Sequence, residues 1–100
     1  MAKTIWRISL DKLAKTKEIE VDAPEGSVVL CFRAHTDHPT IWVRCDPEAP
    51  NVGLGQIALV PTGKDATLYD GDAGWQYIGS DSFYDDKVIL HAFWKYRVAP

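Results

Sequence analysis

Apolar and polar side chains alternate along most of this chain, and that alternation limits its fold more than any other feature. A period of two places successive side chains on opposite faces of an extended strand. No window carries apolar residues at helical spacing over three turns, so long helices are excluded. Segments with the strand pattern, or with a fully apolar version of it, are residues 4–10, 17–22, 27–34, 40–45, 56–60, 75–79 and 87–97.

Turn-forming residues separate these segments at intervals of roughly 8–12 residues, the spacing expected of a β-sandwich or barrel. Pro and Gly in residues 23–26 favour a turn, and two prolines in residues 46–51 exclude a strand interior. We interpret residues 64–74 as a loop and residues 81–86 as a turn. We therefore predict one all-β domain over residues 1–100. It has about seven short, mostly antiparallel strands in a compact sandwich or partly open barrel.

Length and charge narrow the possible partners. The chain has 100 residues, which fits a single domain, and its net charge is −3. Proteins that bind duplex DNA usually carry a positive excess, so we expect no duplex partner. No apolar run approaches the ~20 residues of a membrane helix. Lys3, Arg7 and Asp11 interrupt the N-terminal segment too often for a secretory signal. We expect a cytoplasmic protein with reduced cysteines and no membrane partner.

Residues 27–34 and 40–45 predict a hairpin, and residues 27–34, apolar on both faces, predict a central strand. A two-residue turn at positions 36–37 places Cys31 opposite Trp42, whereas a turn at positions 37–38 places Cys31 opposite Arg44. In both registers Cys31 and Cys45 point to opposite faces of the sheet. Only a three-residue turn brings the two cysteines directly opposite each other.

The same hairpin contains Cys31, His35, His38 and Cys45, which together resemble a zinc ligand set. The two registers with short turns separate the thiols, and no Cys-x-x-Cys spacing is present. We therefore predict no metal site and no disulfide. The simpler interpretation is that both cysteines are small buried apolar residues.

One face of the hairpin is a candidate binding surface. With Cys31 opposite Trp42, the side chains of Arg33, His35 and Trp42 share a face. Guanidinium groups match phosphate, and an indole offers a surface for a base. A solvated sheet face with Trp42 packed on arginine stems is the commoner arrangement. The predicted ligand-binding residues are Arg33, His35, Trp42 and Arg44, with Lys95 and Arg97 as further phosphate donors.

No motif predicts catalysis. Gly63-Lys64 is followed by Asp65 and lacks the upstream glycine of a phosphate loop, and residues 70–74 lack the ligands of a calcium loop. His91 lies in the middle of a strand, where we expect a hydrogen-bonded sheet residue. Ser80 and Ser82 fall in or beside a predicted turn, with no histidine near them in sequence. We therefore predict a non-enzymatic protein without a cofactor.

Several short motifs follow one another along nearly the whole chain. They are Ile5-Trp6-Arg7, Pro39-Thr40-Ile41-Trp42, Asp46-Pro47-Glu48-Ala49, Thr62-Gly63, Tyr77-Ile78-Gly79 and His91-Ala92-Phe93. In this order the chain resembles a family of small, uncharacterised bacteriophage proteins of similar length. Residues 63–76 depart from the pattern by forming a longer acidic segment. The family has no established activity, so the resemblance supplies no functional residues.

The resemblance implies a phage protein in the cytoplasm of a bacterial host. Small accessory phage proteins often act by stoichiometric binding, so we expect a protein that counters bacterial defence. Sequestration of a small anionic signalling nucleotide is the first hypothesis. A chain this short rarely encloses a ligand pocket alone, so we expect a homo-oligomer. One alternative is an inhibitor of a host defence protein, with acidic residues 65–72 and 81–86 imitating nucleic acid. Another is a virion or assembly component.

Overall fold

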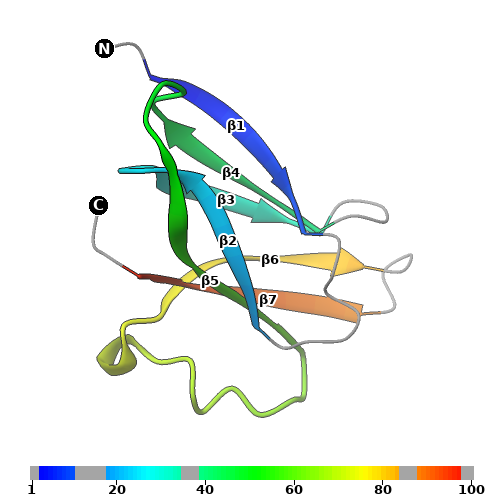
Figure 1. Cartoon of the computed structure of the whole chain (residues 1–100). Coiled ribbons are helices and arrows are strands. Elements are labelled where there is room, and N and C mark those ends of the chain that lie inside the picture. The colour runs from blue at the N-terminus through cyan, green and yellow to red at the C-terminus, as the bar shows by residue number, and fades with distance from the viewer. Residues whose placement is uncertain (1–2, 11–17, 35–38, 84–87, 98–100) are drawn as a thin grey trace.

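The chain folds into two β-sheets (Figure 1). The computed structural model describes residues 3–10, 18–34, 39–83 and 88–97. Within these ranges the strands are β1 (Thr4–Ser9), β2 (Glu18–Pro24), β3 (Val28–Arg33), β4 (Thr40–Cys45), β5 (Asn51–Pro61), β6 (Gln76–Phe83) and β7 (Val88–Tyr96). One 3-10 turn, η1 (Gly71–Ala73), precedes β6. The predicted all-β class is confirmed.

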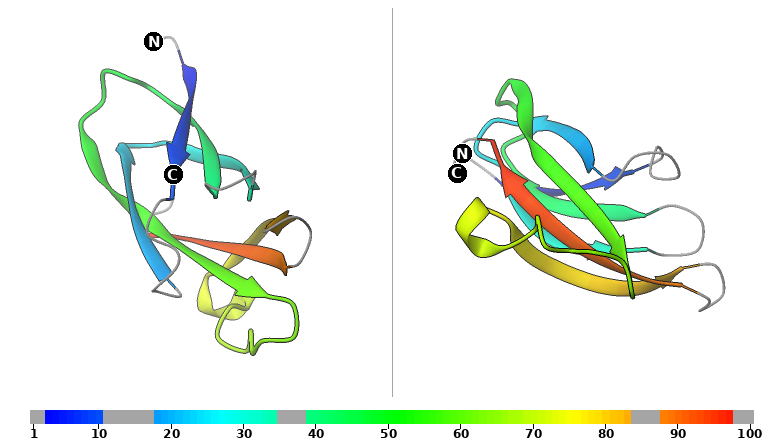
Figure 2. Two further views of the ribbon diagram at one scale, coloured as in Figure 1. Left: turned by 90° about the vertical axis from the view of Figure 1, so that its right-hand side faces the viewer. Right: turned by 90° about the horizontal axis from the view of Figure 1, so that it is seen from below.

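Each sheet is antiparallel. Strands β1, β4 and β3 lie in that order in one sheet, and β2, β5, β7 and β6 form the other. Figures 1 and 2 show β3 running beside β6. There the backbone N–H of Ala34 donates to the Asp81 carboxylate at 3.0 Å, across the boundary between the sheets. The two sheets do not close into a barrel.

The main core fills the space between the inward faces of the two sheets. Alternation along β4 buries Ile41, Val43 and Cys45, and alternation along β7 buries Ala92 and Trp94. None of these five side chains exposes measurable surface. Because burial of one large apolar side chain contributes about 1.5–3 kcal/mol, these paired faces supply much of the stability.

A second apolar cluster lies on the outward face of the four-stranded sheet. Ala58 and Val60 of β5 point away from the main core and pack with the buried Tyr69 and Trp75. The rings of Tyr69 and Trp75 meet edge to face, with centroids 4.9 Å apart. The Asp70 carboxylate accepts from the backbone N–H of Ala73 at 2.9 Å and caps η1. The acidic segment predicted as a loop therefore folds back over this sheet.

Three details of the strand prediction are wrong. Strand β3 was expected at the centre of a sheet but lies at an edge, and a bulge at Leu30 leaves that residue 43% exposed. Strand β6 runs through Ser80 and Ser82, which were placed in or beside a turn. Strand β5 has 11 residues rather than the five predicted, because its glycines lengthen the strand without adding apolar side chains.

Candidate functional site

The register of the β3–β4 hairpin decides which side chains share a face. Cys31 pairs with Trp42, and Arg33 pairs with Thr40, which is the first of the two registers that the short turns allow. Cys31 and Cys45 consequently lie on opposite faces, as predicted. Cys45 is buried but Cys31 is exposed, so the expectation of two buried cysteines is wrong for Cys31. Burial raises the pKa of the Cys45 thiol, and the charge of Asp46 raises it further.

His35 and His38, the two imidazoles of the zinc interpretation, lie outside the described residues. Across the part of the chain that is described, no three histidine, cysteine or acidic side chains are grouped to hold a metal ion. The separation of Cys31 and Cys45 removes the thiol pair on which that interpretation depended.

Trp42 lies at the centre of the outward face of the three-stranded sheet. Its cross-strand neighbours are Arg7 on β1 and Cys31 on β3. Arg44 lies two residues along β4 on the same face, and Arg33 lies diagonally opposite on β3. We call this surface the Trp42 face; its outward residues are Ile5, Arg7, Ser9, Val28, Cys31, Arg33, Thr40, Trp42 and Arg44.

The Trp42 face is cationic although the whole chain is negative. Its three arginines, Arg7, Arg33 and Arg44, are all exposed, and none of its residues is acidic. No described carboxylate lies within ion-pair distance of these three guanidinium groups. Trp42 is half-buried and Ile5 is 60% exposed, so apolar surface lies between the cations. This combination offers a ring surface with unneutralised positive charge around it.

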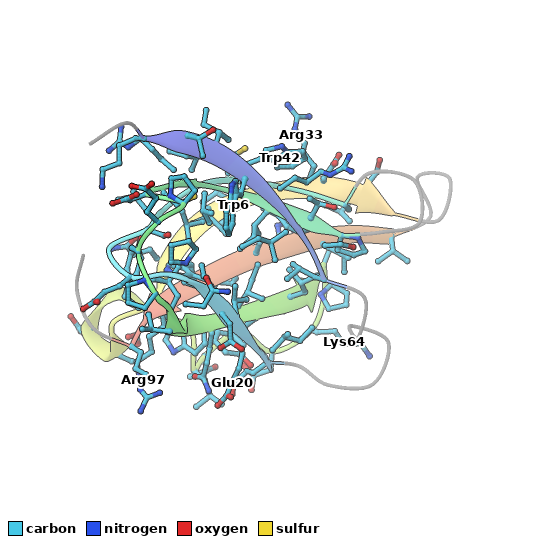
Figure 3. The ribbon with its side chains drawn as sticks, turned by 45° about the horizontal axis from the view of Figure 1, so that its top comes forward. Trp6, Glu20, Arg33, Trp42, Lys64 and Arg97 are labelled. Atoms are coloured by element: carbon cyan, nitrogen blue, oxygen red, sulfur yellow. The ribbon has the colours of Figure 1, made fainter. Side chains whose placement is uncertain are left out.

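The six predicted ligand-binding residues do not form one site. Arg33, Trp42 and Arg44 come together, while Lys95 and Arg97 belong to the other sheet. Figure 3 shows Arg33 and Trp42 on one side of the molecule and Arg97 on the opposite side. His35 lies outside the described residues.

Sequence reasoning missed Arg7. Alternation places Arg7 and Trp6 on opposite faces of β1, but it does not say which strand pairs with β1. The pairing of β1 with β4 brings Arg7 directly across from Trp42. The Ile5-Trp6-Arg7 motif carried no signal for this contact, because β1 and β4 are separated by some thirty residues of sequence.

His91 on the four-stranded sheet is hydrogen-bonded at both ring nitrogens to hydroxyl side chains. Its Nδ1 lies 2.6 Å from Ser80 Oγ and its Nε2 lies 2.6 Å from Thr62 Oγ1. Tyr77 Oη lies 2.5 Å from Ser80 Oγ. The prediction that His91 is a hydrogen-bonded sheet residue is confirmed, but Ser80 is its direct cross-strand partner. Within the described residues no carboxylate bonds this imidazole, so two hydroxyls orient it.

The described part of the chain contains no helix long and apolar enough to cross a membrane. No curated protein and no solved structure gives a significant match to the chain. One family, described as a domain of unknown function (DUF7352), matches residues 1–100. The match spans the two sheets and the whole Trp42 face. The chain therefore belongs to the DUF7352 family, a domain of unknown function.

Proposed function

We propose that this protein is a non-enzymatic binding protein whose Trp42 face holds an anionic ligand with a planar ring, of the nucleotide class. The observation that carries the proposal is the row Arg7–Trp42–Cys31, flanked by Arg33 and Arg44. The indole gives a base a surface for stacking, and the guanidinium groups suit phosphate oxygens. No described carboxylate neutralises these arginines.

The spacing of the face fits such a ligand. Directly opposed side chains on an antiparallel pair have Cβ atoms about 4.5–5.5 Å apart, and diagonal neighbours lie about 7–8 Å apart. A base on Trp42 thus leaves Arg7 and Arg33 within reach of its phosphate. Stacking contributes about 1–3 kcal/mol per base. With two charge-assisted hydrogen bonds of about 2 kcal/mol each, the gross gain is roughly 6 kcal/mol. Association also costs translational and rotational freedom, so the dissociation constant should exceed the tens of micromolar that about 6 kcal/mol alone would give.

A second copy of the chain would enlarge the face. Strand β1 pairs with β4 along one edge, and no described strand pairs with the other edge. Ile5 and Trp6 are exposed there, which makes β1 an unprotected edge. Two β1 strands from two copies can pair antiparallel with Trp6 of one opposite Trp6 of the other. In that register Arg7 lies opposite Ile5 of the second copy, so the two arginines do not repel each other directly. This arrangement supports the proposal of a homo-oligomer with two adjoining Trp42 faces.

The proposal includes a biological role for nucleotide binding. The resemblance to bacteriophage proteins supports sequestration of a signalling nucleotide in the cytoplasm of a bacterial host, as a means of countering defence. Inhibition of a host defence protein is supported less well. Asp65 and Asp70 of the acidic segment already accept local backbone hydrogen bonds from Thr67 and Ala73, at 2.9 Å each. Their carboxylates are therefore partly engaged in holding the segment's own fold.

Calorimetric titration with adenosine monophosphate, a cyclic dinucleotide and uncharged adenosine tests the proposal. We expect the charged ligands to bind, and Trp42→Ala and Arg33→Gln each to weaken binding about tenfold, equal to about 1.4 kcal/mol. Trp42→Phe retains a ring and should lose less. Lys64→Gln is the matched control, because Lys64 is an exposed cation elsewhere on the chain. Equal affinities for all four variants would rule out this face, and binding of a host protein alone would favour the inhibitor role.

A further inference from the structure

The outward face of the four-stranded sheet contains a hollow of about 470 Å³. Its lining includes Glu20 of β2, Gly53 and Gln56 of β5, Lys95 of β7, and Arg97 just after β7. A volume of this size falls within the ~300–1,000 Å³ typical of small-molecule sites. The hollow lies on the opposite side of the molecule from the Trp42 face (Figure 3). It therefore constitutes a separate surface.

Glycine and a bulge create the hollow. The register between β2 and β5 shifts between Val21 and Asp22, so that Asp22 pairs with Gly53. The extra residue, Leu54, is buried in the main core. Gly53 then faces outward with no side chain, and a Cβ built on it would lie 3.0 Å from Arg97 Nη1. The floor of the hollow at Gly53 is thus main chain, covered at one side by the Arg97 guanidinium.

The charges around the hollow follow the strand order. Gln56 pairs with Glu20 on one side and with Lys95 on the other, which makes an acid–neutral–base row. Gly53 pairs with Asp22, and Arg97 is fixed on the other side by its N–H bond to the Leu54 carbonyl at 2.9 Å. Both rows therefore place a carboxylate on β2 and a cation on or just after β7.

These opposite charges form no ion pair within the described residues. The backbones of β2 and β7 lie about 10 Å apart across β5 at normal strand spacing. The Asp22 and Arg97 side chains both reach over Gly53, where a Cβ would lie 3.8 Å from Asp22 Oδ1 and 3.0 Å from Arg97 Nη1. No ion pair joins Glu20 or Asp22 to Lys95 or Arg97 in the structure as described. The Lys95 stem instead passes Gly74, and its ammonium lies 5.8 Å from the centre of the Trp75 ring. The lining of the hollow therefore has one carboxylate, Glu20, on its β2 side and two cations, Lys95 and Arg97, on its β7 side.

We propose that this hollow binds a small zwitterion that carries one ammonium and one carboxylate group, such as a free α-amino acid. Its carboxylate lies against Arg97 and Lys95, and its ammonium lies against Glu20. A simple anion would gain from Arg97 but meet the Glu20 carboxylate, and a simple cation would meet the opposite conflict. The ligand class therefore follows from the two sides together and is independent of nucleotide binding at Trp42.

The test is an NMR titration of the whole protein with the standard free L-amino acids at millimolar concentration. N-acetylated and amidated forms of each hit serve as singly charged comparisons. At least one amino acid should shift signals of Gly53 and Gln56, and both modified forms should bind at least tenfold more weakly. Glu20→Gln and Arg97→Gln should each weaken binding about tenfold, and Gly53→Val should abolish it. Glu20 and Arg97 are exposed, so their variants should fold.

Arg33→Gln is the matched control, since it removes a cation from the other sheet. It should leave amino-acid binding unchanged while weakening nucleotide binding, which separates this proposal from the previous one. Absence of any shift with every amino acid would overturn the proposal. Equal binding of an N-acetylated form would also overturn it, because the hollow would then be a plain anion site.

Discussion

Replacing Gly55 with alanine tests the packing of β5 against β7 more sharply than any other single change. A Cβ at this position would overlap the carbonyl oxygen of Lys95 and lie 2.7 Å from Cζ2 of Trp94. The first contact is main chain, and the second is a side chain with no exposed surface. Neither can move without separating the two strands, so the overlap must be relieved by opening the ladder.

The expected cost follows from two terms. Overpacking of a dense core costs about 1–3 kcal/mol. Loss of the adjacent ladder hydrogen bond, from the Arg97 backbone N–H to the Leu54 carbonyl, adds about 1 kcal/mol. Gly55→Ala should therefore destabilise the protein by about 2–4 kcal/mol. For 100 residues this corresponds to a fall in Tm of roughly 10–25 °C.

Gly53→Ala is the matched control, two residues away in the same strand. Its nearest obstacle is the end of the flexible Arg97 side chain, 3.0 Å away. Alanine in a strand is favoured over glycine by about 0.5–1 kcal/mol, so Gly53→Ala should be neutral or slightly stabilising. Urea unfolding followed by tryptophan fluorescence measures both variants. Equal stability of the two variants would refute the placement of Trp94 over Gly55.

Two further predictions concern titratable groups. Cys31 should react with a thiol reagent in the native state and Cys45 only on unfolding, because Cys31 is exposed whereas Cys45 is buried with a raised pKa; two fast-reacting thiols would contradict this. The pKa of Tyr69 is raised by burial and then by the charge and hydrogen bond of Glu18. The contribution of Tyr69 to the free energy of unfolding should be complete below pH 10.0, the ordinary pKa of tyrosine. It should decline above that pH, because the Tyr69 hydroxyl loses its proton at a lower pH in the unfolded chain than in the folded protein. Between pH 8 and 11 the urea midpoint of Tyr69→Phe should fall less steeply with pH than that of the unmodified protein. Equal slopes for the two proteins would show that Tyr69 does not cause the loss of stability.

Local pattern was enough to predict the strands and to reduce the hairpin to two short-turn registers. Alternation and fully apolar runs together located all seven strands, and the structure has the register that pairs Cys31 with Trp42. Both inferences rest on neighbours in sequence. The edge position of β3 differs from the prediction, because a segment that is apolar on both faces indicates a strand covered on both faces, whereas Cys31 and Leu30 are exposed.

Long-range pairing was not accessible in the same way. Arg7 joins the Trp42 face only through the pairing of β1 with β4. The split of Lys95 and Arg97 from Arg33 depends on which sheet each strand enters. The hollow over Gly53 depends on a bulge and on β5 lying between β2 and β7. A single sequence carries local periodicity but no direct record of strand order.

The indole N–H signals in an NMR spectrum test the central claim most directly. Each of the four tryptophans gives one signal, and Trp42→Phe identifies that of Trp42. On addition of adenosine monophosphate the Trp42 signal should move, while those of the buried Trp75 and Trp94 stay in place. Arg7→Gln should reduce the apparent affinity about tenfold, or about 1.4 kcal/mol, because Arg7 lies directly across from Trp42. A shift confined to Trp75, or no shift of any indole, would contradict nucleotide binding at the Trp42 face.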